Sequence, residues 1–507
     1  MNANEEDPKS DGPSTDIGVF NRIIILLKFR LHWALYKRFP NFTSRFFDYN
    51  KVRKFHREAD KEENEKTRLP NDEKIELQFL MAAELYGPGE ISRLVHGINK
   101  YGWQDPDGLS PNDGAAEWLR ASREVGGFGG RYSLGRIERS SNTPQSSRIL
   151  KGPVPAGVEY ISLYIVPITS SLTCLVATFS LEKSRTTAYA NILEKDRKTR
   201  YERFAGGIQV LDVMNLKRND IREERRRIQA IASNWFRDTI PGILVNGQLG
   251  ESLATLEFLT TTEVDPLSGH VDTDSKWAEC IPISSSHRAW KCDELEQLKL
   301  TWDMWPDREP GHGIAAMNIS NVSSDKLPYP MFKDRFNYIY LAEENLRDLL
   351  SRHATLIVLR GFLRNLNTIR DTIREARSPS KDVIAALSRI ENFFLESLGV
   401  PSILNELKDH ASENGSFSRH MSSFSEVAPR RKEDKPRKLQ NQMRENVEQL
   451  AGNLKEADKS ARELFVQYSA LISTQESVRV QRAMMKLTCA AIFLSIISLM
   501  VAVLGLR

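Results

Sequence analysis

The sequence has little cysteine and little histidine. Its 507 residues include 9 histidines and 4 cysteines, namely Cys174, Cys280, Cys292 and Cys489. Cysteines placed in this way do not make a disulfide framework, which suits a reducing cytosol. Zinc sites usually take about four ligands at close, paired spacings, whereas Cys280, His287, Cys292 and His312 are spaced more widely. We therefore expect no metal site and no cofactor.

Short catalytic motifs are also missing. There is no G-x-S-x-G, so the sequence does not indicate a Ser-His-Asp arrangement. The glycine cluster Gly126–Gly130 follows an expected helix and is not followed by GKS or GKT, so a helix end explains it better than a phosphate loop. We predict a non-enzymatic protein. The alternative, an enzyme tethered to a membrane with its site around His287, Cys292 and His312, predicts bound metal.

A strong excess of one charge is absent too. The chain has 71 Lys+Arg and 67 Asp+Glu, a net charge of +4, which argues against a dedicated nucleic-acid binder. The first 20 residues are acidic and polar and lack the apolar core of a signal peptide. The length favours about two or three folded units, and 40% hydrophobic residues suit a soluble body.

One long uncharged run stands out against this background. Leu487 to Leu506 reads LTCAAIFLSIISLMVAVLGL, and its polar residues, among them Ser495 and Ser498, can bond to the backbone of their own helix. At about 1.5 Å of rise per residue the run covers about 30 Å, the thickness of a bilayer's hydrocarbon core. We predict a transmembrane helix, because only a helix satisfies every backbone amide of a single segment in lipid.

Basic residues next to this run predict its orientation. Arg479, Arg482 and Lys486 precede it, and Arg507 alone follows it. The larger basic cluster stays on the cytoplasmic side of a membrane. We expect a single-pass membrane protein with the bulk of the chain cytoplasmic and with the lipid bilayer as a partner.

The rest of the chain divides by composition. The predicted fold class is an α+β (or α/β) cytosolic domain, then long helices and a coiled-coil stalk, then one C-terminal transmembrane helix. The predicted parts are a disordered segment 1–18, a basic N-terminal helical segment and connector 19–72, the α+β domain 73–335, a helical region 336–410, a linker 411–437, a stalk 438–486 and the span 487–506.

Several elements of the domain follow from local patterns. We predict helices from Glu73 to Leu85, from Glu90, over Ala115–Glu124 and over 184–240. Two strands are expected within Val158–Leu181, with a turn at Thr169-Ser170-Ser171, and another within Leu253–Val264. Pro167 places the first of these strands toward a sheet edge. In the Arg222–Arg227 run, charges of both signs predict pairing within one helix.

Apolar periodicity then predicts the long helices. A helix of about ten turns runs from Phe336 to about 376, and a second, starting after Ser378-Pro379-Ser380, ends at Gly399-Val400-Pro401. The last helix carries apolar residues at alternating steps of three and four, which predicts a stalk that self-associates or pairs with the 341–376 helix. The stalk positions are Val447, Leu450, Leu454, Ala457, Ala461, Leu464, Tyr468 and Leu471, followed in register by Val478 and Met485, with Gln475 and Arg482 as polar interruptions.

The junction of stalk and span resembles the stalk-to-first-span junction of the CorA-type divalent-cation transporter superfamily. The resemblance is carried by Gln481–Thr488 and Ala491–Leu494, together with the overall order of domain, long helices and span. That family ends this span with a Gly-Met-Asn signature and adds a second span, whereas the corresponding place here reads Gly505-Leu506-Arg507. The resemblance implies an oligomer around a membrane axis and a divalent cation as a candidate partner, but not ion selectivity.

These features favour a C-terminally anchored, non-enzymatic sensor, scaffold or membrane effector that forms a homo-oligomer through its stalk. A CorA-like divalent-cation channel, or a degenerate relative of one, is an alternative in which Ser495 and Ser498 face a narrow pore. The membrane-tethered enzyme is the other alternative.

Overall fold

The structure is a computed structural model. It describes residues 49–103, 114–125, 130–139, 149–204, 207–247, 251–268, 276–284, 288–302, 311–323, 325, 335–375, 400–429 and 434–505. The predictions for residues 1–48, for most of the glycine cluster and for the helix after Ser380 lie outside these residues. The chain divides into two compact units, Met1–Lys66 with Asp196–Leu216, and Thr67–Lys195 with Lys217–Arg507.

The smaller unit joins a helix to a β-hairpin. Helix α3 (Tyr49–Lys66) precedes the antiparallel pair β6 (Arg200–Phe204) and β7 (Gly207–Leu211). Asp60 of α3 accepts a hydrogen bond of 2.5 Å from the Thr199 hydroxyl, and Asn64 bonds to both backbone groups of Arg197. These bonds tie the start of the hairpin to the helix.

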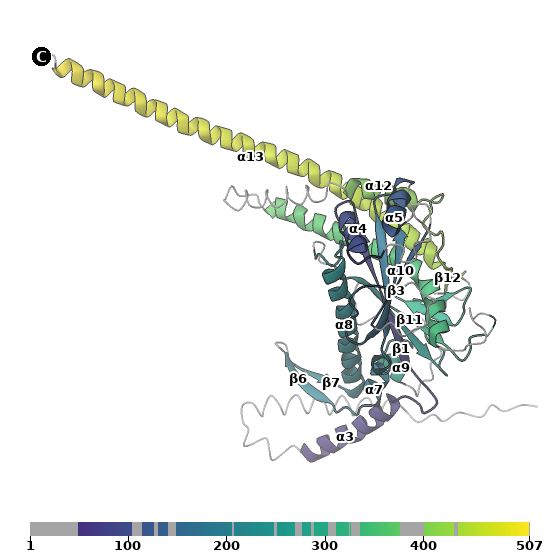
Figure 1. Cartoon of the computed structure of the whole chain (residues 1–507). Helices are drawn as coiled ribbons and strands as arrows, with labels where there is room; N and C mark the ends of the chain where they lie inside the picture. Colours follow the sequence, from purple (N-terminus) through teal and green to yellow (C-terminus); the bar gives the residue numbers. More distant parts are fainter. Residues whose placement is uncertain are drawn as a thin grey trace, which may run out of the picture. The chain divides into compact units, whose positions relative to one another are not determined.

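A ten-stranded mixed sheet forms the centre of the larger unit (Figure 1). Neighbouring strands are antiparallel except for the pairs β11–β8 and β2–β3, which are parallel. The strand order is β12 (Phe424–Glu426), β9 (Ala289–Cys292), β10 (Leu298–Thr301), β11 (His312–Asn318), β8 (Ala254–Thr261), β1 (Glu76–Tyr86), β5 (Thr173–Leu181), β4 (Val158–Pro167), β2 (Tyr132–Glu138) and β3 (Ile149–Leu150). The predicted mixture of helices and strands is confirmed.

One face of the sheet is covered by helix α8 (Val213–Thr239). Leu80 of β1 is opposite Phe179 of β5 and Glu257 of β8, so these three side chains share this face. Trp235 and Phe236 of α8 meet Phe179 edge-on, with ring centroids 5.6 and 6.5 Å away. The part of the larger unit that precedes α10 in sequence also contains five short helices. They are α4 (Ile91–Lys100), α5 (Ala115–Glu124), α6 (Lys183–Thr186), α7 (Ala188–Glu194) and α9 (Trp277–Cys280).

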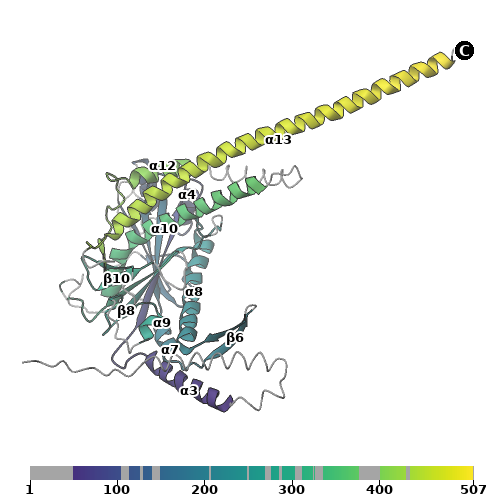
Figure 2. The same ribbon diagram turned by 180° about the vertical axis from the view of Figure 1, so that it is seen from behind.

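The opposite face is covered by helix α10 (Arg335–Glu375), which contacts β1, β5 and β8. Beyond α10 lie α12 (Val400–His410) and the first part of α13 (Leu439–Gly505), and α13 contacts both of the other helices. Figures 1 and 2 show α8 and α10 on opposite sides of the sheet. The larger unit is therefore layered as helix, sheet, helix and a further layer of helices.

Strand β1 corrects a prediction, because the segment from Glu73 to Leu85 was expected to be a helix. Its residues after Glu76 are all buried, since strands cover both of its edges and helices cover both faces. A strand buried on both faces shows no alternation of polar and apolar residues. Leu, Met, Ala and Glu favour helix locally, and the position in the sheet overrides that preference.

Some predictions for the neighbouring segments are confirmed and others are wrong. Helix α5 has the predicted bounds, and β4 and β5 are the two expected strands. Pro167 does not mark a sheet edge, because β4 lies between β5 and β2 and the proline is its last residue. The 184–240 segment contains α7 and α8 but also the hairpin β6–β7.

Two predictions after residue 399 are also corrected. Val400-Pro401 begins helix α12, where a helix end was expected, because proline fits the first turn of a helix as well as it ends one. Phe424–Glu426, within the expected linker, pairs with β9 at the edge of the sheet. This pairing joins residues far apart in sequence, so no local pattern announces it.

Glu84, near the end of β1, connects that strand to the segment after α8. Its buried carboxylate accepts hydrogen bonds from the backbone N–H groups of Leu85, Leu244 and Val245, at 2.8, 2.8 and 2.9 Å. Burial raises the pKa of Glu84 to about 7, although the three hydrogen bonds oppose the rise.

We expect this carboxyl to make stability depend on pH. The folded-state pKa is above the unfolded value of 4.5, so the folded state holds its proton longer and stability falls as pH rises from about 4.5 to about 7. The loss is on the order of 3 kcal/mol. Glu84→Gln should flatten the slope in urea unfolding of the detergent-solubilised chain, while the exposed Glu124→Gln should not. An unchanged slope in Glu84→Gln would contradict this.

Candidate functional site

Helix α13 has 67 residues and two different halves. In its first half, buried side chains recur every three or four residues and face α10 and α12. These are Met443, Val447, Ala451, Leu454, Asp458 and Ala461. Of the predicted stalk residues, Leu450 and Leu464 are half-buried, and the side chains of Tyr468 and Leu471 lie outside the described part of the chain. The first half thus belongs to the core of the larger unit.

An ion pair and a hydrogen bond hold the start of α13 at the edge of the sheet. Lys438 Nζ lies 2.5 Å from Oδ2 of Asp293, just after β9, and 2.9 Å from the Ser425 hydroxyl of β12. Although burial acts in the opposite direction, hydrogen bonds from Lys438, Ser423 and Ser425 lower the pKa of Asp293. The carboxylate is therefore charged near neutral pH and holds the ammonium group.

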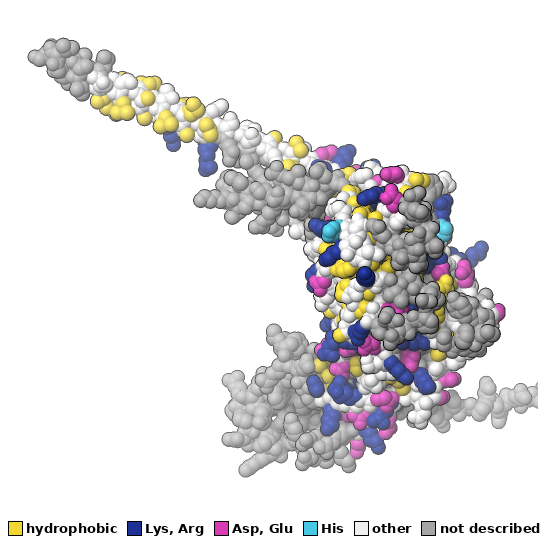
Figure 3. Space-filling model, viewed as in Figure 1, with side chains coloured by type: hydrophobic (Ala, Val, Ile, Leu, Met, Phe, Trp, Pro, Cys, Tyr) yellow, Lys and Arg dark blue, Asp and Glu magenta, His cyan; other side chains and the backbone are white. Residues whose placement is uncertain are grey.

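The second half of α13 is exposed and apolar. The segment Ser477–Ser498 is long and apolar enough to cross a membrane, with 0% of it buried, and it is the one such helix in the described residues. Leu487 and Phe493 are 71% and 65% exposed, and Figure 3 shows apolar side chains around this part of the helix. Large apolar side chains left in water over this length are unfavourable, so they need a covering phase or partner.

Polar side chains in this half turn back to their own helix. The Thr488 hydroxyl donates to the Met484 carbonyl and the Ser495 hydroxyl to the Ala491 carbonyl, both at 2.8 Å. A hydroxyl bonded in this way is satisfied without water, which removes most of the cost of placing it in lipid. The helix continues to Gly505, and Leu506 lies outside the described residues.

Helix α10 separates α13 from the sheet, and its middle part, residues 345–359, is enclosed on all sides. Every residue from 345 to 359 is buried, although the stretch includes charged and polar side chains. Arg352 donates from Nε to the Phe417 carbonyl at 3.1 Å, and His353 stacks on Trp302 with ring centroids 3.9 Å apart. Burial lowers the pKa of His353 to about 3, so the ring is neutral at physiological pH.

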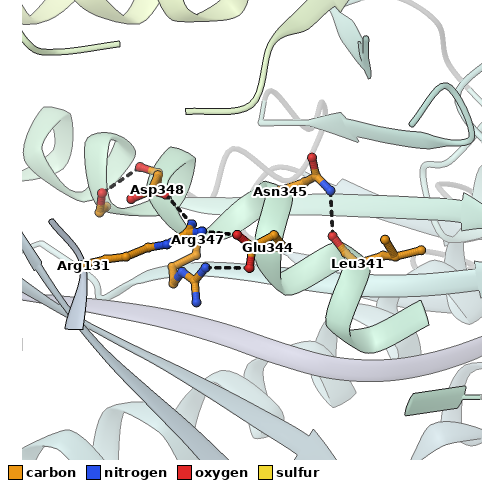
Figure 4. Close-up of polar contacts among 7 residues, drawn as sticks. Arg131, Leu341, Glu344, Asn345, Arg347 and Asp348 are labelled. Carbon is orange, nitrogen blue, oxygen red and sulfur yellow. Dashed lines mark hydrogen bonds and ion pairs between the residues drawn. The ribbon is translucent and has the colours of Figure 1, made fainter. Parts of the chain in front are cut away.

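Ion pairs connect α10 to the sheet (Figure 4). Arg131, just before β2, pairs with Glu344 and lies 3.2 Å from Asp348. Arg347 Nη2 lies 3.1 Å from Glu344, and its guanidinium carbon is 4.0 Å from the ring centre of Tyr164 on β4. The network combines ion pairs with a cation–π contact and fixes how α10 sits on the sheet.

Glu343 adds an ionisable group to the same interface. Burial raises its pKa, while the hydroxyl of Thr178 and the cations Arg347 and Arg136 oppose the rise. Arg136 itself stacks over Tyr160, 3.9 Å from the ring centre. The charges on α10 thus face a sheet surface of hydroxyls, aromatic rings and arginines.

The α8 side of the sheet holds an ion pair that the sequence analysis missed. Arg225 of α8 and Glu257 of β8 are both almost fully buried and 2.7 Å apart, and Tyr189 donates to Glu257 at 2.7 Å. Although burial raises it, the charge of Arg225 and the contact with His312 lower the pKa of Glu257 to about 2. The sequence feature that could have indicated this buried pair is Glu257, because it is the one acidic residue within a strand of apolar and threonine residues. By contrast, Arg227 pairs with Glu223 and Glu224 on the exposed face of α8, as predicted.

The histidine and cysteine set considered for an enzyme does not converge in the described residues. Strand register places Cys292 on the α10 face, where it contacts Asn345, and His312 on the α8 face, where it contacts Thr255. His287 lies outside the described residues. Among the residues that the structure describes, no group of three or more His, Cys, Asp or Glu side chains could hold a metal ion.

We expect the packing of α13 on α10 to depend on Leu454, which is fully buried. Leu454→Ala should lower stability by about 2–5 kcal/mol, because it leaves a cavity between helices. Val466→Ala, at a site that is 65% exposed, should change it by less than about 0.5 kcal/mol. Hydrogen exchange of residues 443–461 in the detergent-solubilised chain would show the difference. Equal protection in both variants would mean that α13 does not depend on this contact.

Comparison with known proteins adds no relative: nothing among protein-family models, characterised proteins or solved structures matches this chain.

Proposed function

We propose that this protein is a non-enzymatic membrane protein that couples a cytoplasmic α/β domain to a C-terminal span through one rigid helix. The observation that carries the proposal is the continuity of α13, which has no break from Leu439 to Gly505. Its first half is part of the domain core and its second half is exposed and apolar.

A continuous helix transmits displacement and rotation because its backbone hydrogen bonds leave no hinge. From Ala461, the last buried residue among the described side chains of α13, to Leu487, where the uncharged run begins, the helix rises about 40 Å. A change in how α10 sits on the sheet would therefore reach the membrane as a movement of α13. The ion pairs of Arg131 with Glu344 and Asp348 are the contacts through which the sheet biases that position.

Self-association of α13 completes the proposal. Val478 is 41% exposed and lies in the half of α13 that no other described element covers. Val478 belongs to the predicted heptad positions, and a parallel coiled coil would bury it against other copies. A homo-oligomer would bring several domains around one set of spans, so that movements of individual stalks add.

The anchor is tested by cell fractionation. We expect the full chain to stay in membranes washed with alkaline carbonate, and a variant lacking residues 477–507 to be released into the supernatant. Ile492→Lys/Ile496→Lys keeps the length of the helix but puts two charges at mid-span, at about 2.5–3.5 kcal/mol each, and should also be released. A full-length chain that appears in the supernatant without detergent would contradict the proposal.

Self-association is tested by disulfide cross-linking in membranes, in a Cys489→Ser background. Val478→Cys occupies a heptad position, whereas Val480→Cys is also exposed but lies off the predicted seam. We expect oxidation to give mainly dimers with Val478→Cys and few with Val480→Cys. Equal yields from both positions would indicate random collision, and no dimer from either would indicate a monomeric anchor.

A further inference from the structure

Three basic residues form a stripe along α13 just before its uncharged run. Arg479, Arg482 and Lys486 follow one another at steps of three and four, which places them within about 60° of the helix circumference. All three side chains are exposed. Figure 3 shows basic side chains on one side of the extended part of the helix, with apolar side chains around them.

This stripe carries more positive than negative charge. Glu476, three positions before Arg479, is the nearest acidic residue in the sequence, and none follows it from Ser477 to Arg507. Among the side chains that the structure describes, none of the three cations takes part in an ion pair, whereas Arg462, in the first half, pairs with Asp458 at 2.8 Å. Three cations after a single carboxylate leave the stripe with a net positive charge.

The stripe also lies at a defined depth. Arg479, Arg482 and Lys486 lie within the exposed segment Ser477–Ser498, but they precede its uncharged part. The stripe rises about 10 Å along the helix and ends one residue before Leu487, so a span that begins at Leu487 places the three cations at headgroup level. Arg482 occupies a predicted heptad position, so close packing between copies of α13 over the stripe itself would bring like charges together. The proposed self-association would therefore lie before the stripe, up to Val478. A phosphate-bearing surface suits the stripe better, since guanidinium groups bind phosphate oxygens in pairs.

We propose that Arg479, Arg482 and Lys486 bind the phosphate groups of anionic phospholipids in the leaflet that faces the domain. This inference rests on the proposed membrane anchor. The stripe would set the depth and rotation of α13 in the bilayer, because the three side chains share one side of the helix. The rigid helix that is proposed above to couple the domain to the membrane would then respond to the lipid composition of the membrane.

Lipid selectivity tests the inference. The full chain is reconstituted in vesicles of equal phosphatidylcholine and phosphatidylglycerol, extracted in mild detergent, and analysed for the lipids that remain bound. We expect phosphatidylglycerol to be enriched, and Arg479→Gln/Arg482→Gln to reduce the enrichment by about tenfold or more, since each basic residue near the surface contributes about fivefold. Lys455→Gln/Lys459→Gln, two exposed cations in the first half of α13, should leave it unchanged.

The outcomes separate the two proposals. Equal enrichment in the stripe variant and the full chain, or an equal loss in the Lys455→Gln/Lys459→Gln control, would overturn the stripe while leaving the anchor intact. Loss of enrichment when inorganic phosphate replaces chloride at the same ionic strength would assign the stripe to free phosphate and overturn the lipid assignment. A chain that does not enter vesicles of phosphatidylcholine alone would overturn the anchor and, with it, the inference.

Discussion

The burial of α10 between the sheet and two further helices is the constraint on which the rest of the larger unit depends. A helix enclosed over residues 345–359 has no solvent to satisfy its charged groups, so each must find a partner inside the protein. Arg352 takes the Phe417 carbonyl, and Asp348 takes Arg131. These partners come from sequence positions on both sides of α10, and their bonds therefore hold the sheet, α10 and the segment after α12 in one arrangement.

The placement of α13 follows from that arrangement. The side of α10 that faces away from the sheet is covered by the buried residues of α13 between Met443 and Ala461. The Lys438–Asp293 ion pair fixes where α13 begins to pack on α10. Because the same helix then continues without interruption, the direction of its exposed half is decided by contacts inside the domain and not by a flexible joint.

The sequence predicted what local chemistry determines. The Thr169–Ser171 turn separates β4 from β5, and the apolar periodicities of α10 and α13 are long enough to be unambiguous. It did not predict what depends on distant partners. β1 reads as a helix because both of its faces are buried, and Arg225 reads as one of many surface charges because its partner Glu257 is 32 positions away. The ion-pair network of α10 was missed for the same reason, since Arg131 and Glu344 are 213 positions apart.

Local and distant determinants would have separate roles in the proposed membrane protein. The apolar segment of α13 and the cations before it are local features, which would fix where the helix meets the membrane. The position of α10 depends instead on residues far away in the sequence, because the partners in its ion pairs lie on other elements. In the proposed function, α13 packs on α10 and continues into the membrane, so a change in the position of α10 would move the span. By linkage, a change in the bilayer would shift the position of α10 with the same coupling energy. The carboxyl of Glu343 lies within that interface, where burial raises its pKa and the cations Arg347 and Arg136 oppose the rise. The interface between α10 and the sheet is therefore where the proposed coupling between the domain and the membrane would act.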